Sequence, residues 1–153
     1  MDMKYLLLVV AAVSLASCHR HIKDPELRGI ENVKLDRFTL GKSTVEFQVR
    51  YYNPNAFNAK LKRAEGDAWI DSIYVGHFNV DSMVVIPASS DFLVPVKLAV
   101  DMKYMMQNAM TTMMKKEVWI RVTGTARAGR KGFYKNIPIK YQGLQDISKL
   151  MKF

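Results

Sequence analysis

The sequence is poor in the residues and motifs that most often mark a chemical site. It has one cysteine, Cys18, among 153 residues, so a disulfide within the chain and a cysteine-rich metal site are both excluded. It contains neither a Gly-x-Ser-x-Gly elbow nor a His-Glu-x-x-His motif. Its acidic residues are scattered rather than paired. We therefore expect a protein that is not an enzyme and that uses no cofactor and no metal.

The sequence also lacks an apolar run at its start that is long enough to cross a bilayer, which takes about 20 residues. The run at residues 5–16, YLLLVVAAVSLA, follows one lysine and has the length of the apolar region of a secretory signal. It ends in Leu15-Ala16-Ser17-Cys18, which resembles the lipobox of bacterial lipoproteins. The resemblance implies that residues 1–17 are a lipoprotein signal peptide, and that lipidation attaches a diacylglycerol to the thiol of Cys18.

A lipidated Cys18 implies an address in the bacterial cell envelope, with the membrane as partner. Stable anchoring needs more than one acyl chain, because each buried methylene contributes only about 0.8 kcal/mol. His19 stands where an aspartate is associated with inner-membrane retention, so we expect the outer membrane. No acidic run follows Cys18, and we expect the domain to face the periplasm. The alternatives are a chance cysteine after a buried helix, an uncleaved anchor, or a catalytic or metal-binding thiol.

Basic residues outnumber acidic ones, which gives a net charge of +9. In an exported lipoprotein we expect no nucleic acid partner, and instead anionic lipid or an envelope protein. The candidate contacts with an anionic surface are Lys115, Lys116, Arg121, Arg127, Arg130, Lys131, Lys135 and Lys140. Several would share a face if the strand of Arg121 pairs with the strand of Lys140. The alternative is an ordinary solvated surface, or a sheet edge protected by lysines.

Alternation of apolar and polar residues dominates the chain from residue 30 on, which is typical of half-buried strands. The clearest runs are TVEFQVRYY, FLVPVKLAV, VWIRVTGTA and NIPIKYQ (44–52, 92–100, 118–126, 136–142), and further strands are expected at 30–35, 59–64, 68–73 and 76–86. This predicts a mainly all-β, antiparallel β-sandwich. It forms one domain, residues 30–153, behind a polar tether at 18–29.

Turn residues separate these runs: Gly41, Asn53-Pro54-Asn55, Gly66, Gly76, Pro87 and Gly129 to Gly132. Pro54 cannot donate to a ladder and holds Asn53 extended, so the strand must stop there. We assign Asn-Pro-Asn a structural role rather than a ligand site. Pro95 lies inside a strand pattern, which predicts an edge strand or a bulge.

One segment, DMKYMMQNAMTTMMKK at 101–116, follows a helical period instead. Its stripe is Met102, Met105, Met106, Ala109, Met110 and Met113. Asp101 suits an N-cap, and Lys115 and Lys116 suit the negative end of the helix dipole. We expect one short methionine-rich α-helix across an end or open flank of the sandwich, with methionines as core. A surface for an apolar ligand or partner and a Cu(I) site are the alternatives.

A family resemblance emerges from three ordered stretches. VRYYNPNAFNAKL (49–61) resembles the start of the water-stress (WHy) domain of type-2 late embryogenesis abundant (LEA) proteins. DSIYVGHF (71–78) and VIPASSDFLVPVKLAVD (85–101) are similar to its strand–turn–Gly segment and its Ile-Pro-Ala stretch. The resemblance covers about 30–147 and departs at the methionine-rich segment and the basic turn at 127–131. It implies a fibronectin-III/immunoglobulin-like sandwich and a role in desiccation or other stress, without catalytic residues.

The histidines offer weak sites. His77 lies alone and is expected to be structural, while His19 and His21 lie in the tether without further ligands. The sequence as a whole predicts a lipid-anchored, non-enzymatic envelope protein that binds or stabilises envelope components. A structural or assembly subunit would instead show a large exposed apolar patch. An enzyme would need a deep polar pocket where acids or His77 converge.

Overall fold

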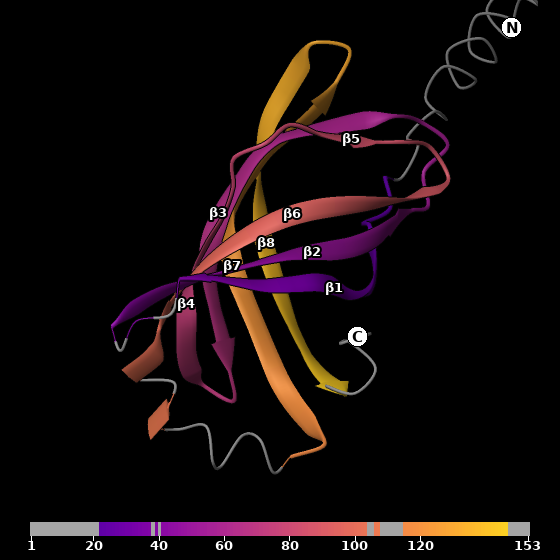
Figure 1. Ribbon diagram of the computed structural model, residues 1–153. Coiled ribbons are helices and arrows are strands. Elements are labelled where there is room, and N and C mark those ends of the chain that lie inside the picture. Colours follow the sequence, from indigo (N-terminus) through magenta and orange to yellow (C-terminus); the bar gives the residue numbers. More distant parts are fainter. Residues whose placement is uncertain (1–21, 38, 40, 104–105, 108–114, 147–153) are drawn as a thin grey trace, which may run out of the picture.

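The computed structural model describes residues 22–146 apart from 38, 40, 104–105 and 108–114 (Figure 1). Within these residues the chain forms one antiparallel sheet in the order β1-β2-β6-β4-β3-β7-β8, with β5 paired to β3. The prediction of an antiparallel all-β fold is therefore confirmed. Cys18 and the signal sequence lie outside the described residues.

The strands are long for a domain of this size, and all but β5 have eight residues or more. They are β1 (Glu26–Arg37), β2 (Lys42–Asn53), β3 (Ala59–Ile70), β4 (Ile73–Val80), β5 (Val84–Ile86), β6 (Ser90–Asp101), β7 (Glu117–Arg130) and β8 (Phe133–Asp146). The first strand begins before the expected start at residue 30. The run expected at 76–86 is broken into β4 and β5 by Asp81-Ser82-Met83.

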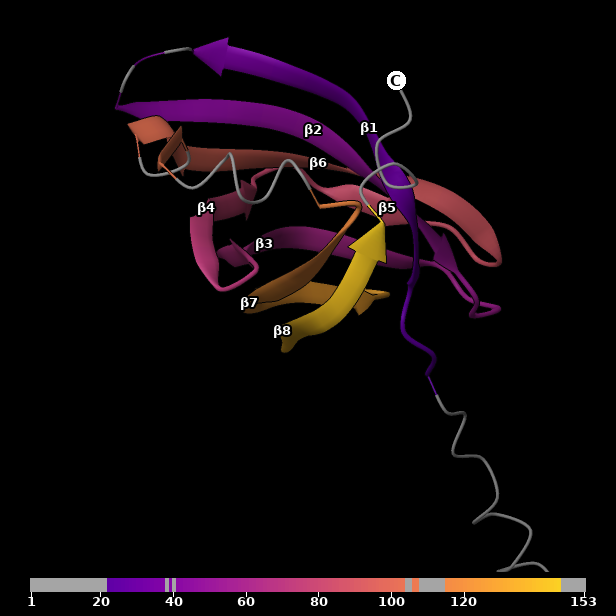
Figure 2. The same ribbon diagram turned by 90° about the horizontal axis from the view of Figure 1, so that it is seen from below.

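The sheet twists and curls strongly, so that β1, β2 and β6 lie across β3, β7 and β8 (Figures 1 and 2). Alternate side chains of both halves point into the space between them. The buried cluster consists of Val49, Leu61, Ala64, Val80, Val84, Phe92, Val94 and Val96, with Ala126, Ala128 and Ile139 packed against it. In β6 and β7 the period-two pattern thus marks the face that meets the core.

Two glycines expected in turns lie inside strands instead. Gly66 is in β3 opposite Gly124 of β7, and a Cβ at residue 66 would stand 2.2 Å from the Thr123 carbonyl oxygen. Gly76 is in β4, where a Cβ would stand 2.0 Å from the Ala99 carbonyl oxygen. The prediction of turns at Gly66 and Gly76 is wrong, because these glycines allow close approach of neighbouring strands.

The two-residue turns use residues with positive φ. Asp71 and Ser72 (φ 48° and 70°) join β3 to β4, and Lys131 and Gly132 (φ 51° and 87°) join β7 to β8. Positive φ at both positions fits a type I′ turn, whose twist matches that of the flanking strands. The turn expected within 129–132 is therefore confirmed.

Pro95 lies where β6 is paired on one side. It is opposite Gln48 of β2, while the pairing of β6 with β4 ends at the Asn79–Lys97 pair. Strand β6 as a whole is an interior strand, but at Pro95 it is a local edge, as predicted. Proline is tolerated there because β4 has ended and no N–H is needed to pair with it.

The expected methionine-rich helix falls mostly on residues 104–105 and 108–114, outside the described residues. On its described flank, Asp101 Oδ1 accepts a hydrogen bond from the Lys103 amide at 3.1 Å. The helix and the fate of its methionines stay predictions. No helix within the described part of the chain is long and apolar enough to cross a membrane.

Candidate functional site

The predicted basic contacts divide among three places. Because β7 and β8 pair with Thr123 opposite Lys140, Arg121, Arg127 and Lys140 share the outer face of this hairpin. Arg130, Lys131 and Lys135 lie at its tip, and Lys115 and Lys116 precede β7. The expectation that several would share a face is confirmed for the first three, but the eight form no single patch.

Strand β3 adds further cations, outside the predicted set of eight, to the tip of the hairpin. Strand β3 runs beside β7 with Lys60 opposite Gly129 and Arg63 opposite Arg127. We call the resulting group the basic end: Lys60, Lys62, Arg63, Arg127, Arg130, Lys131 and Lys135. All seven are exposed, and the segments that carry them, 57–64 and 126–137, contain no acidic residue. The run KLKR at 60–63 was a visible signal, but its proximity to β7 depends on strand pairing.

Aromatic rings lie among these cations. The Lys62 ammonium is 4.0 Å from the centroid of the Tyr134 ring, and the Arg130 guanidinium is 4.7 Å from that of Phe57. Phe133 is 83% exposed. The basic end is therefore a surface with both charge and apolar area, at a hairpin turn.

The Asn-Pro-Asn segment joins three parts of the chain. Asn53 is 2% exposed, and its Nδ2 donates to the carbonyls of Phe57 at 3.1 Å and Pro87 at 2.8 Å. Its Oδ1 accepts from the Asn55 amide at 3.0 Å. Asn55 in turn exchanges hydrogen bonds with the Lys23 backbone, at 2.9 and 2.7 Å. These contacts give the segment the structural role that was predicted.

The Ile-Pro-Ala stretch of the resemblance contacts the Asn-Pro-Asn segment. The Ala88 amide donates to Asn58 Oδ1 at 2.8 Å, and the Ser89 amide donates to the Asn55 carbonyl at 3.0 Å. The Ile-Pro-Ala stretch therefore packs on the Asn-Pro-Asn loop, although 30 or more residues separate each hydrogen-bonded pair. The shared role of both motifs is to fix one end of the sheet.

His77 was expected to lie alone, but in the structure it has a partner. Its Nδ1 lies 3.1 Å from Asp67 Oδ1, which also accepts a hydrogen bond from the Tyr74 hydroxyl at 2.9 Å. Burial, together with that hydrogen bond, raises the pKa of Tyr74. Beside this group the Arg121 guanidinium stacks 4.5 Å from the Trp69 ring centroid. The partner was missed because Asp67 and His77 become neighbours only when β3 pairs with β4.

This cluster lies on an exposed sheet face. The Asp67 and His77 side chains are each roughly half exposed, at 41% and 53%, and neither lines the two hollows described next. Within the described residues no three His, Cys, Asp or Glu side chains gather as a metal site.

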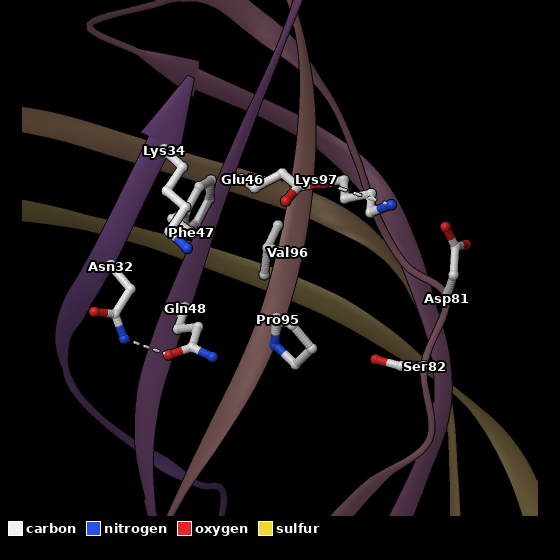
Figure 3. A pocket seen from close by; sticks show the side chains of 10 residues that line it. All are labelled: Asn32, Lys34, Glu46, Phe47, Gln48, Asp81, Ser82, Pro95, Val96 and Lys97. Carbon is white, nitrogen blue, oxygen red and sulfur yellow. Dashed lines mark hydrogen bonds and ion pairs between the residues drawn. The ribbon is translucent and has the colours of Figure 1, made fainter. Parts of the chain in front are cut away.

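Two hollows lie on the half of the sheet formed by β1, β2 and β6. The larger, about 590 Å³, is lined mainly by Asn32, Lys34, Glu46, Gln48, Asp81 and Lys97 (Figure 3). The Asn32 and Gln48 side chains hydrogen-bond across it at 2.6 Å, and Lys97 lies 3.5 Å from Glu46. The smaller, about 420 Å³, contains Arg50 3.9 Å from Asp91. Since several of these polar groups bind neighbouring side chains, the arrangement fits a solvated outer face.

Exposed apolar side chains occur along much of the described chain, and two groups of them lie on the β7–β8 hairpin. Trp119 lies opposite Leu144 on the outer face of β7 and β8. Phe133 and Ile137 lie near the tip of the same hairpin.

Comparison with solved structures shows likeness of fold at low sequence identity. The Arabidopsis thaliana protein At1g01470 has a TM-score of 0.50 and is 13% identical over 83% of this chain and 84% of its own. An Archaeoglobus fulgidus protein has a TM-score of 0.48 and is 10% identical over 79% of this chain and 97% of its own. A candidate late embryogenesis abundant (LEA) protein, At2g46140.1, has a TM-score of 0.36 and is 14% identical, over 94% and 82%. No protein-family model and no curated protein sequence matches the chain.

Proposed function

We propose that the chain is a lipid-anchored, non-enzymatic protein of the bacterial cell envelope whose domain binds or stabilises envelope components under stress. The observation that carries this proposal is Leu15-Ala16-Ser17-Cys18, followed within eight residues by the first strand of a folded domain. Lipidation of Cys18 holds the domain at a membrane, on the periplasmic side of the outer membrane.

The domain itself is an LEA type-2-like, fibronectin-III/immunoglobulin-like β-sandwich. Two halves of the curled sheet enclose one core, which supports the sandwich. The contact between the Asn-Pro-Asn and Ile-Pro-Ala segments supports the LEA relationship, because it gives the two motifs a common structural reason. The likeness to At1g01470 supports a fold shared over most of the chain.

Fatty-acid labelling tests the anchor. Cells that express the wild-type chain or Cys18→Ala are grown with an alkyne fatty acid, and the protein is captured and probed for the label. We expect label on the wild type and none on Cys18→Ala. Equal labelling of both forms would refute lipidation at this residue.

A second candidate is a subunit of an envelope protein complex, favoured by the exposed Trp119–Leu144 pair. Affinity capture of the membrane-extracted protein, with bound lipids and proteins identified by mass spectrometry, distinguishes the two. A partner protein that Trp119→Ser loses supports the subunit. If neither lipid nor protein is enriched over Cys18→Ala, the binding role is abandoned.

A further inference from the structure

The basic end carries charge that is open to a ligand. Arg28, Arg50, Lys97 and Lys115 are each paired with a carboxylate. By contrast, Lys62 and Arg130 lie over aromatic rings, and within the described residues neither forms an ion pair with an acid. A cation–π contact holds a guanidinium or ammonium in place without neutralising it.

The shape of the hairpin places an aromatic ring beyond these charges. Lys131 and Gly132 form the turn, and Phe133 follows immediately. At the top of Figure 1 the turn between β7 and β8 stands clear of the other strands. Phe133 is the most exposed large apolar side chain in the described part of the chain, at 83%. An exposed ring flanked by cations suits the headgroup region of a bilayer, where aromatic side chains and lysines both gather.

The chain leads to Cys18 from the same end of the sheet. Lys23 is hydrogen-bonded to Asn55, and two residues further on Phe57 lies under Arg130. Lys23 is five positions after Cys18, so their Cα atoms can be no more than about 18 Å apart. A bilayer that holds acyl chains on Cys18 is therefore within reach of the basic end.

Acidic residues at this end reduce the charge only in part. Glu26 lies 2.8 Å from Arg28, and Asp91 lies 3.9 Å from Arg50. One further acidic residue, Asp24, precedes β1 in the sequence. The seven cations of the basic end still outnumber these three acidic residues.

We propose that the basic end is a binding site for anionic lipid, in which its lysines and arginines contact headgroup phosphates and Phe133 inserts its ring among the headgroups. The lipid site deepens the proposed function, and it rests on that function only for which membrane is bound. A hairpin that makes both contacts would orient the domain on the bilayer. An acyl anchor on a polar tether does not orient it.

Vesicle flotation tests the site without lipidation. The probe is the chain from residue 18 with Cys18→Ala, which contains every described strand and core residue, and far-ultraviolet circular dichroism confirms the fold of each variant. Vesicles contain phosphatidylcholine alone or with 30% phosphatidylglycerol. We expect binding to the anionic vesicles only, weakened by salt because counterions screen the contact.

Two triple variants remove the same charge from different places. Arg130→Gln/Lys131→Gln/Lys135→Gln changes the basic end, and Lys42→Gln/Lys97→Gln/Lys103→Gln changes exposed lysines elsewhere. We expect the first to weaken binding on the order of 100-fold, at about fivefold for each cation, and the second by less than fivefold. Phe133→Ser should weaken binding about tenfold at unchanged charge.

Equal losses in the two triples would show attraction by net charge alone and overturn the site. So would wild-type protein that ignores phosphatidylglycerol, or that binds phosphatidylcholine equally well. A protein partner captured by the wild type and lost by the first triple, without vesicle binding, would assign the surface to protein instead. Because acylation plays no part in this assay, its failure leaves the labelling of Cys18 untouched, and the reverse also holds.

Discussion

Asp71 has a role that its place in the sequence does not reveal. It occupies the first position of the turn between β3 and β4, with φ of 48°. Its Oδ2 accepts from Lys115 Nζ at 2.8 Å, and its Oδ1 accepts from the Trp119 amide at 2.9 Å. The hydrogen bond from Lys115, and then that from Trp119, lowers the pKa of Asp71. Lys115 therefore ties a turn to the start of β7, whereas the sequence had placed it among the lipid contacts.

Replacing Asp71 by Asn tests this tie, since asparagine also tolerates positive φ. We expect a loss of about 1 kcal/mol of unfolding free energy at pH 7, a modest value because Lys115 is exposed. A lowered folded-state pKa means that the stabilisation is present above about pH 4 and is lost as the pH falls through the folded pKa. The difference in unfolding free energy between Asp71→Asn and wild type should therefore become smaller as the pH is lowered.

Urea unfolding from pH 7 down to pH 3 measures this difference. Asp81→Asn is the matched control, because its exposed carboxylate accepts a hydrogen bond, within the described residues, from the nearby Asn79 side chain alone. It should cost less than about 0.5 kcal/mol. A gap between wild type and Asp71→Asn that stays constant with pH would contradict the argument.

At the scale of elements, the loops at one end of the sheet depend on a single buried amide. Asn53 closes β2 and donates to the loop that enters β3 and to the loop between β5 and β6. Proline at 54 stops the strand, and the Asn53 side chain then takes the place of backbone pairing for these carbonyls. One side chain thus sets the relative position of two connections.

Asn53→Ala should remove about 2–3 kcal/mol of unfolding free energy, because two carbonyls lose their donor in a buried site. Asn58→Ala, which removes one exposed acceptor from the Ala88 amide, should cost about 0.5–1 kcal/mol. The measurement is the denaturant concentration at the midpoint of unfolding for each variant. The midpoints are compared at an equal slope of unfolding free energy against denaturant concentration. Equal costs would show that the buried amide is not the main link.

At the scale of the molecule, one core serves both halves of the curled sheet. Val94 of β6 belongs to the same buried cluster as Leu61 and Ala64 of β3. The sheet is also continuous, because β4 pairs with both β6 and β3. The two halves should therefore unfold together.

Val94→Ala should lower the stability by about 2 kcal/mol, because a buried apolar side chain leaves a cavity. Hydrogen exchange should then quicken by about 30-fold in the most protected amides of β2 and β6 and also in those of β3 and β7. Leu93→Ala, at the exposed neighbouring position, should change little. Faster exchange confined to β2 and β6 would mean that the halves open separately.

Much of the fold could be predicted from local pattern. Val45, Phe47, Val49 and Tyr51 alternate with polar residues because a strand buries every second side chain, so β2 was visible before its partners were known. The prediction of turns at Gly66 and Gly76 was wrong for a related reason. A glycine in a turn and a glycine under a neighbouring carbonyl look alike until the strands are paired.

The sequence by itself determined the alternation that makes the strands, the stop at Asn53-Pro54, the motif at Cys18 and the excess of positive charge. These are properties of neighbouring residues, and local chemistry specifies them. Only the tertiary structure decided which distant residues meet. Pairing of β3 with β7 brings Arg63 beside Arg127, and pairing of β3 with β4 brings Asp67 beside His77. Strand order depends on contacts far apart in the chain, so the basic end could be recognised only in the folded sheet.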